Sequence, residues 1–187
     1  FDAVSFEFDF VAKQDLSKFN YVFGSEEYPE FVGSGFNDVF AFYLTDLETD
    51  ETSNLAVLPN TNTPVTINTI NDRLNANYYT DNRPFKHIEQ PSNPIELDGL
   101  TKKLTAFSEV TPGRRYRIKI VLADVGDDNL DSAVFLEQGS FESMPKETFF
   151  LEYQDYLNGF ELPNEKRELA DSEKESSLIT ATEESNL

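Results

Sequence analysis

The chain has 187 residues, which suits one domain of ordinary size with a remainder. It carries 15 Lys and Arg residues against 35 Asp and Glu residues, a formal net charge of −20, and this balance argues against binding to nucleic acid or to anionic membranes. The absence of Cys excludes a disulfide framework, a thiol nucleophile and a thiolate metal site. No apolar run approaches the roughly 20 residues that span a bilayer, so we expect no direct membrane insertion. Because the sequence begins at Phe1, inside a strand pattern, we expect a mature or excised piece of a longer protein.

Alternating apolar residues predict three β-strands in the first part of the chain. Residues 3–11 place apolar and polar side chains on opposite faces, as a half-buried strand does, and residues 19–23 repeat this pattern. Residues 39–44 are apolar almost throughout, which is typical of a central strand covered on both faces. The apolar face of the first strand consists of Val4, Phe6, Phe8 and Phe10.

Shorter elements are expected in the middle of the chain. Residues 46–54 have the composition of a polar hairpin loop, and residues 55–58 and 65–70 that of two short strands separated by turn-forming residues. Residues 71–94 are rich in Asn, Asp and Pro and show little periodicity, so we expect the long loop of the domain there. Long loops in compact domains are usually functional or mobile.

Regular strand patterns return further along, at residues 97–110, 115–123, 132–136 and 139–141. Many short strands with no convincing helix before residue 145 predict an all-β fold, a β-sandwich or jelly roll of short, mostly antiparallel strands. We expect this domain to cover residues 1–142. Residues 143–187 would then form an acidic extension or linker, part helical or disordered.

The segment ADVGDDNLDS at residues 123–132 concentrates oxygen ligands directly after a strong strand. Hard cations such as Ca²⁺ take about six to eight oxygen ligands, which a loop dense in Asp and Asn supplies, whereas a transition metal would favour His or Cys. The spacing does not fit an EF-hand, so the segment predicts a Ca²⁺-binding loop of a β-sandwich. The alternative is a solvated turn whose Asp side chains accept from their own backbone amides. The candidate metal ligands here are Asp124, Asp127, Asp128 and Asp131.

A second acidic cluster supplies Glu26, Glu27, Asn37 and Asp38 as further candidate metal ligands. Glu26 and Glu27 are adjacent, so they act together only on an irregular backbone, which the neighbouring Gly and Pro residues favour. A glycosidase also uses two carboxylates. No nucleophile, His or oxyanion motif accompanies this cluster, so we expect no enzymatic activity.

The long loop offers a separate candidate site for a ligand. Tyr78 and Tyr79 follow Asn77, and aromatic rings together with amides suit the binding of a carbohydrate. The alternative is a loop packed by its own tyrosines. His87, the single histidine, lies in the same loop and is expected to face solvent or to cap the core.

Three runs of the sequence carry a family resemblance. They are NYVFGSEEYPEFVGSGFNDVFAFYL, NLAVLPNTNTPVTINTIN and ELDGLTKKLTAFSEVTPGRRYRIKIVLADVGDDNLDSAVFLEQGSF. In order and spacing they resemble the bacterial choice-of-anchor L domain across residues 1–142, and the motifs FxSEEY and DVGDxxxDS are specific when found together. The resemblance implies a secreted or cell-surface protein, often large and multidomain, and no enzymatic activity. The upstream part of the domain is lacking here, so one or more N-terminal strands are expected from elsewhere, and the residues after 142 match no sorting signal.

The resemblance and the two acidic clusters lead to one functional expectation. A β-sandwich brings distant strand ends together at one edge, so the two clusters are expected to meet there and to share one Ca²⁺ ion. We therefore expect a non-enzymatic, extracellular, Ca²⁺-binding structural or adhesion module of a larger bacterial cell-surface protein, with other domains or subunits of a surface assembly as partners. The alternatives are a carbohydrate-binding module that binds glycans through residues 71–94, and a subunit of a surface filament or envelope complex.

Overall fold

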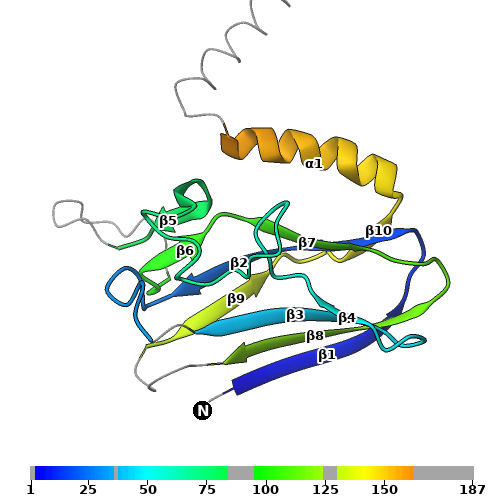
Figure 1. Ribbon diagram of the computed structural model, residues 1–187, viewed down its shortest axis with the longest axis horizontal. Coiled ribbons are helices and arrows are strands. Elements are labelled where there is room, and N and C mark those ends of the chain that lie inside the picture. Colours follow the sequence, from blue (N-terminus) through cyan, green and yellow to red (C-terminus); the bar gives the residue numbers. More distant parts are fainter. Residues whose placement is uncertain (1–2, 36–37, 84–94, 124–129, 162–187) are drawn as a thin grey trace, which may run out of the picture. The chain divides into compact units, whose positions relative to one another are not determined.

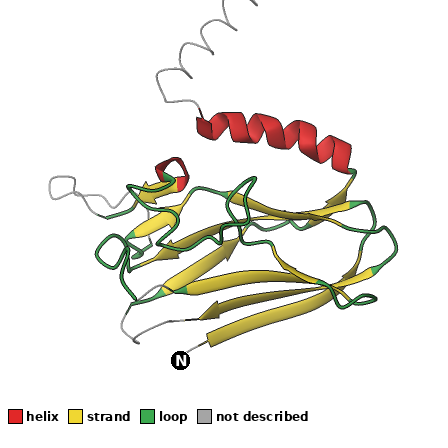
Figure 2. Cartoon of the chain, in the orientation of Figure 1, coloured by secondary structure: helices red, strands yellow, loops and turns green. Residues whose placement is uncertain are grey.

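The computed structural model describes residues 3–35, 38–83, 95–123 and 130–161, and this part of the chain is built mainly of β-strands with one α-helix (Figures 1 and 2). Asn37, His87, Asp124, Asp127 and Asp128 lie outside the described residues. The elements are β1 Ala3–Val11, β2 Leu16–Ser25, β3 Val39–Asp46, β4 Thr52–Asn54, the 3₁₀-helix η1 Ala76–Tyr78, β5 Tyr79–Asp81, β6 Gly99–Thr101, β7 Leu104–Glu109, β8 Arg115–Ala123, β9 Ser132–Leu136, β10 Glu142–Met144 and α1 Lys146–Glu161.

The first sheet contains four antiparallel strands in the order β1-β8-β3-β4. β8 lies between β1 and β3 because its nine residues pair with β1 along their whole length and with β3 over Val39–Asp46. Val39 and Ala3 both lie opposite Ala123, so three strand ends meet where β8 stops.

The second sheet is centred on β2. β7 pairs with residues 16–21 of β2 and β6 with residues 24–25, while β10 and β9 pair with residues 16–18 and 21–25. Because β7 and β10 both pair with the start of β2, they must lie on opposite sides of it, and the same holds for β6 and β9 at its end. β5 extends the sheet beyond β6.

The core lies between the two sheets and is largely aromatic. Rings on the inner face of β2 contact rings of β3 at centroid distances of 5.0 Å for Phe19 and Phe42, 4.7 Å for Tyr21 and Phe42, and 4.8 Å for Phe23 and Phe40. Since all of these side chains are buried, each contributes about 1.5–3 kcal/mol of transfer free energy to folding. The predicted all-β sandwich with antiparallel strands is therefore confirmed.

Two of the predicted short strands are wrong. Residues 55–58 and 65–70 form irregular backbone with a single bridge between Val57 and Pro64, and the strand of this region is β4 instead. Local side-chain hydrogen bonds explain the difference, because Asn54 Oδ1 accepts from the amides of Phe42 and Ala56 at 3.0 Å. The apolar residues of this segment are nevertheless buried in the core, and their burial produced the misleading pattern. They are Leu55, Ala56, Leu58, Val65, Ile67 and Ile70.

The last strand also lies later in the sequence than predicted. The chain turns at residues 137–140, where the Ser140 amide donates to the Glu137 carbonyl at 3.2 Å and Gly139 has a φ of +76°, and the strand follows as β10. A positive φ is accessible to glycine at little cost, whereas a strand requires an extended backbone. The Gly residue therefore marks the turn before β10 and does not begin a strand.

The aromatic segment after β10 forms α1. The Lys146 amide donates to Asp15 Oδ1 at 2.8 Å, and a carboxylate at a helix N-terminus compensates unpaired amides and the helix dipole. Phe149 packs on Phe107 of β7 at a ring distance of 4.6 Å. Residues beyond 150 belong to a second unit of the chain, in which the rings of Tyr153 and Tyr156 stack at 5.4 Å.

Candidate functional site

The two acidic segments approach each other at one end of the sandwich. The Glu26 amide donates to the Asp131 carbonyl at 3.0 Å, and the Asp131 amide donates to Glu26 Oε2 at 3.1 Å. Sheet pairing causes this contact, because Ser25 at the end of β2 lies opposite Ser132 at the start of β9. Two residues that are 105 positions apart in sequence are thereby held by two hydrogen bonds.

A second pair of acidic side chains lies at the same turn. Glu27 is 2% exposed and Asp38 is 1% exposed, and the Asp38 amide donates to Glu27 Oε2 at 3.4 Å. The Glu27 amide in turn donates to Ser25 Oγ at 3.0 Å. Glu27 and Asp38 are therefore both buried, and the Glu27 carboxylate lies against the backbone at the point where the chain enters β3.

The turn between β2 and β3 has the irregular backbone that adjacent ligands would need. Tyr28, which is fully buried, is joined to Pro29 by a cis peptide bond, and its hydroxyl donates to the Ile70 carbonyl at 2.7 Å. The ring lies so close to Gly99 that a Cβ at that position would be 2.5 Å from it. Tyr28 thus fixes the turn that carries both glutamates.

Described residues on either side of the remaining predicted ligands lie at this end of the sandwich. β8 ends at Ala123 opposite Val39, the neighbour of Asp38, and the described chain resumes at Leu130, next to the Glu26 partner Asp131. The chain therefore leaves β8 and returns to β9 beside the two acidic pairs. The four predicted ligands outside the described residues are Asn37, Asp124, Asp127 and Asp128.

The described carboxylates by themselves do not make a complete metal site. Within residues 3–35, 38–83, 95–123 and 130–161, no group of three or more His, Cys, Asp or Glu side chains could hold a metal ion. Carboxylate oxygens are the ligands that Ca²⁺ takes, and it requires about six to eight of them. The described carboxylates have the donor chemistry that Ca²⁺ takes but do not by themselves supply this number of ligands.

Asp98 is an acidic neighbour of this site that the sequence analysis missed. Burial, followed by the charges of Glu30 and Glu26, raises the pKa of the Asp98 carboxyl above its usual value. The sheet explains its position, because the next residue, Gly99, pairs with Ser25. Asp98 lies outside both acidic runs, so only the pairing of β2 with β6 could have revealed it.

The tyrosine rings of the predicted carbohydrate-binding loop do not form an open surface. Tyr79 is buried with its ring 5.0 Å from that of Tyr28, and burial together with Asp81 raises its pKa to about 12. Tyr78 is partly buried and packs against the core, whereas Asn77 is exposed. The ring of Tyr79 is therefore not available to stack on a sugar.

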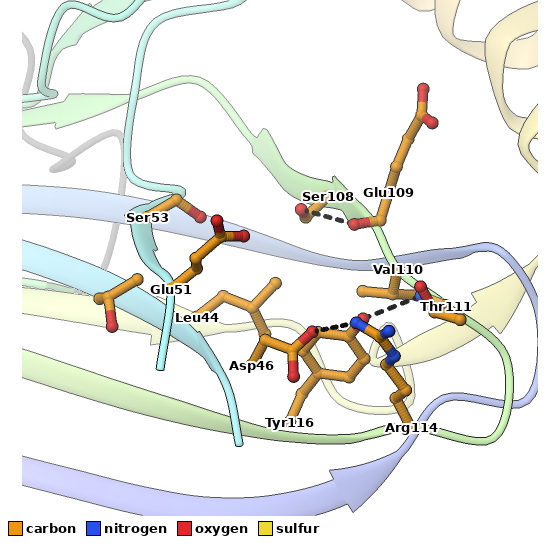
Figure 3. Close-up of a pocket in the computed structure, with 11 residues that line it drawn as sticks. Leu44, Asp46, Glu51, Ser53, Ser108, Glu109, Val110, Thr111, Arg114 and Tyr116 are labelled. Carbon is orange, nitrogen blue, oxygen red and sulfur yellow. Dashed lines mark hydrogen bonds and ion pairs between the residues drawn. The ribbon is translucent and has the colours of Figure 1, made fainter. Parts of the chain in front are cut away.

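A cleft of about 660 Å³ lies at the other end of β3 (Figure 3). Two of its charged residues bond to each other, since Arg114 donates to Asp46 Oδ2 at 3.0 Å, and Arg114 also pairs with the neighbouring Glu48 at 3.3 Å. Bonds from the backbone and from Arg114 keep the pKa of Asp46 below its usual value. The Tyr116 hydroxyl accepts from the Thr111 amide at 2.8 Å. These bonds hold the β7–β8 turn against β3, which is a structural role.

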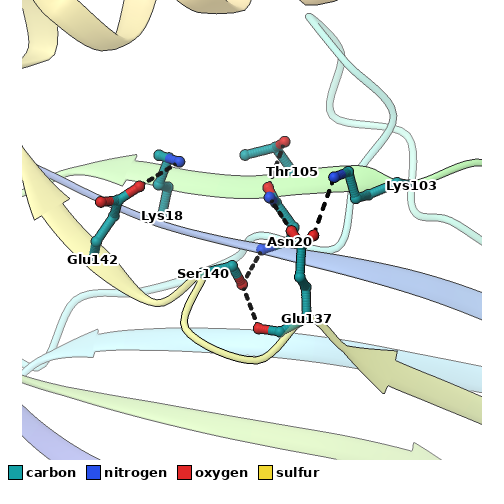
Figure 4. Close-up of polar contacts among 7 residues, drawn as sticks. All are labelled: Lys18, Asn20, Lys103, Thr105, Glu137, Ser140 and Glu142. Atoms are coloured by element: carbon teal, nitrogen blue, oxygen red, sulfur yellow. Dashed lines mark hydrogen bonds and ion pairs between the residues drawn. The ribbon is translucent and has the colours of Figure 1, made fainter.

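A third polar cluster surrounds Asn20 in the middle of β2 (Figure 4). Asn20 Nδ2 donates to Glu137 Oε2 at 2.6 Å, and Asn20 Oδ1 accepts from the Thr105 hydroxyl at 2.9 Å. Ser140 Oγ accepts from the Asn20 amide at 2.9 Å, while Lys103 pairs with Glu137 at 3.2 Å. Asn20 therefore joins β2 to β7 and to the turn after β9.

The fold and this end of the molecule define a class of protein, an antiparallel β-sandwich with acidic turns gathered at one end. Residues 1–142 match the family model of the Choice-of-anchor L domain, and the chain belongs to this family. Membership implies a surface or secreted module of a larger protein. No curated protein and no solved structure matches the chain. Within its described part, the chain has no helix with the length and apolar character needed to cross a membrane.

Proposed function

We propose that this chain is a non-enzymatic, Ca²⁺-binding structural module of an extracellular bacterial surface protein, with a role in adhesion or surface assembly. The observation that carries the proposal is the convergence of two acidic segments from distant parts of the sequence. Glu26 bonds to Asp131, and Glu27 lies beside Asp38 one residue further along the same turn.

Burial of the second pair is the physical argument for a cation. Glu27 and Asp38 are both about 98% or more removed from solvent, and acidic groups in such a place are normally paired or coordinate a metal ion. Ca²⁺ takes carboxylate, amide and carbonyl oxygens in flexible geometry, so a bound Ca²⁺ ion would supply such coordination. Glu26, Glu27, Asp38 and Asp131 would supply part of the shell, and Asn37, Asp124, Asp127 and Asp128 the remainder.

The hydrogen bonds of these glutamates favour a structural role over catalysis. Glu26 and Glu27 each accept from a backbone amide of another segment, so their carboxylates already hold three strand ends together. A cation bound there would fix the same segments more firmly. Such a module would keep its shape wherever extracellular Ca²⁺ is available, which suits a protein that links domains or subunits at a surface.

Calorimetric titration of the 187-residue chain with Ca²⁺ tests the proposal. We expect saturable binding to the wild type and its loss in Asp128→Ala combined with Asp131→Ala. Glu51→Gln is the matched control, since Glu51 is an exposed carboxylate on the β3–β4 hairpin, and its binding should equal that of the wild type. Absence of binding in the wild type, or unchanged binding in the double variant, would refute Ca²⁺ binding by these segments.

A further inference from the structure

One edge of the first sheet is the long strand β1, and the described part of the chain provides no partner on its outer side. Among the described strands, β1 pairs only with β8, so one of its sides is free, as Figure 1 shows at the lower edge of the sheet. Sheet edges are normally blunted by short strands, Pro, bulges or inward-pointing charges. β4 and β5, which end the sheets elsewhere, have three residues each, whereas β1 has nine and contains no Pro and no bulge in its pairing with β8.

The inner face of β1 is apolar over its whole length but covered over only half of it. Phe8 and Phe10 pack against the core, while Val4 is 65% exposed and Phe6 is 60% exposed. All four side chains lie on one face by alternation. At the start of β1, the apolar face that carries the core residues therefore continues but is exposed to solvent.

The opposing sheet exposes apolar groups on the same side of the sandwich. Leu136 of β9 lies opposite the core residue Tyr21 and so belongs to the inner face, yet about half of its surface is exposed. Phe141 is also exposed and contacts Phe8 and Phe10 at ring distances of 5.3 and 5.1 Å. We call Val4, Phe6, Leu136 and Phe141 the open seam.

Charge on the outer face indicates which strand would fit this edge. Glu7 and Asp9 of β1 lie opposite Lys119 and Arg117 of β8, and Asp9 Oδ1 accepts from Arg117 Nε at 2.7 Å. The acidic row of β1 thus has a basic row on one side and a free edge on the other. A strand with Lys or Arg at its outward positions would continue the alternation of charge.

A second copy of the chain fits less well than a basic strand. Antiparallel pairing of two β1 strands with both apolar faces inward places Glu7 opposite Ser5, Glu7 or Asp9 of the other copy, and none of these is basic. Each chain also carries a formal charge of −20, which opposes association.

We propose that β1 is a docking edge for an extended segment from outside these 187 residues, with apolar residues at alternate positions and basic residues between them, which adds a strand to the first sheet and covers the open seam. Backbone hydrogen bonds along a strand of about 30 Å would give affinity, and side chains placed on Val4 and Phe6 would give register. This inference does not depend on Ca²⁺ binding.

Hydrogen exchange of the full chain with a peptide probe tests the docking edge. The probe is a capped nine-residue peptide with Val or Ile at alternate positions and Lys or Thr between them, and the control peptide has the same composition without the alternation. We expect the probe to slow exchange of the β1 amides that face the free edge by about tenfold or more, and the control peptide to leave them unchanged. Equal effects of both peptides, or slowed exchange elsewhere only, would overturn the proposal.

Substitutions on the two faces of β1 separate docking from general attraction to an acidic protein. Phe6→Ser should weaken binding of the probe by about tenfold, with Val4→Ser as a second variant if the first does not fold. Val11→Ser is the matched control, because Val11 is an exposed apolar residue on the outer face of the same strand, and its effect should stay within about twofold. Equal effects of Phe6→Ser and Val11→Ser, or self-association of the chain through β1 in place of peptide binding, would contradict the proposed partner.

Discussion

Glu26 and Asp131 hold two ends of the second sheet together by exchanging hydrogen bonds, one between backbone groups at 3.0 Å and one from the Asp131 amide to Glu26 Oε2 at 3.1 Å. The contact places an acidic turn from the first part of the chain against the segment that enters β9. Glu27 and Asp38 are buried at the same end of the sandwich, which is where the proposed cation would bind.

The stability of the fold should depend on Ca²⁺. A ligand that binds only the folded state stabilises it by mass action, by about 2.7 kcal/mol at a free concentration 100 times the Kd. Thermal unfolding followed by circular dichroism should therefore show a melting temperature that rises with free Ca²⁺ and falls on addition of a chelator. Mg²⁺ at equal concentration is the control, because it prefers fewer ligands and a stricter geometry. A melting temperature that does not respond to the chelator would contradict the proposed role.

Asp98→Asn should stabilise the protein at neutral pH without Ca²⁺. The folded state holds the pKa of Asp98 above its usual value, so the ionised carboxylate opposes folding above that pKa, and the penalty disappears as pH falls through it. Allowing for solvent screening, we expect a gain of roughly 0.5 kcal/mol at pH 7 in urea unfolding and none below about pH 3.5. Glu51→Gln serves as the control. A loss of stability in Asp98→Asn at pH 7 would count against repulsion among Asp98, Glu26 and Glu30.

Gly99→Ala should destabilise the turn that carries Glu26 and Glu27. A Cβ at this position would lie 2.5–2.8 Å from three atoms of the buried Tyr28 side chain, and overpacking of this kind costs about 1–3 kcal/mol. Gly35→Ala is the matched control, since a Cβ there meets nothing within 4 Å. Denaturant unfolding of the two variants should separate them. Equal stability of both would show that Tyr28 can move away without cost.

Tyr28→Phe tests the hydrogen bond that anchors the same turn. The Tyr28 hydroxyl donates to the Ile70 carbonyl at 2.7 Å in a buried place, and removal of the donor leaves that carbonyl without this bond at a cost of about 1–2 kcal/mol. Tyr43→Phe is the control, because Tyr43 is exposed on β3 and its hydroxyl should contribute less than about 0.5 kcal/mol. If the Tyr28 variant were as stable as the Tyr43 variant, the Tyr28 hydroxyl would not stabilise the turn.

The strands could be predicted from the sequence where apolar and polar residues alternate or where an apolar run occurs. β1, β3 and β8 follow from alternation or from an apolar run, whereas their antiparallel pairing joins strands that are distant in the sequence. The segment 55–70 was not predictable in this way, because its apolar residues enter the core from irregular backbone. Side chains such as Asn54 replace the strand partner there with local hydrogen bonds.

The candidate site could be predicted from the sequence only where its acidic residues are clustered along the chain. Glu26 and Asp131 were found because each lies in an acidic run, and the ends of β2 and β9 bring them together. Asp98 stands outside those runs, and its place depends on the pairing of Gly99 with Ser25. Tyr79 is polar enough to suggest a surface ring, yet it packs against Tyr28. Long-range pairing decides both positions, and local composition does not encode it.

A high-resolution diffraction map of the protein crystallised with Ca²⁺ tests the central claim most directly. The account predicts an ion bound by oxygens of Glu27 and Asp38 at about 2.3–2.6 Å, with further oxygens from the segment between β8 and β9. A map in which a Lys or Arg side chain neutralises Glu27 and Asp38, or in which no ion lies within reach of them, would contradict it.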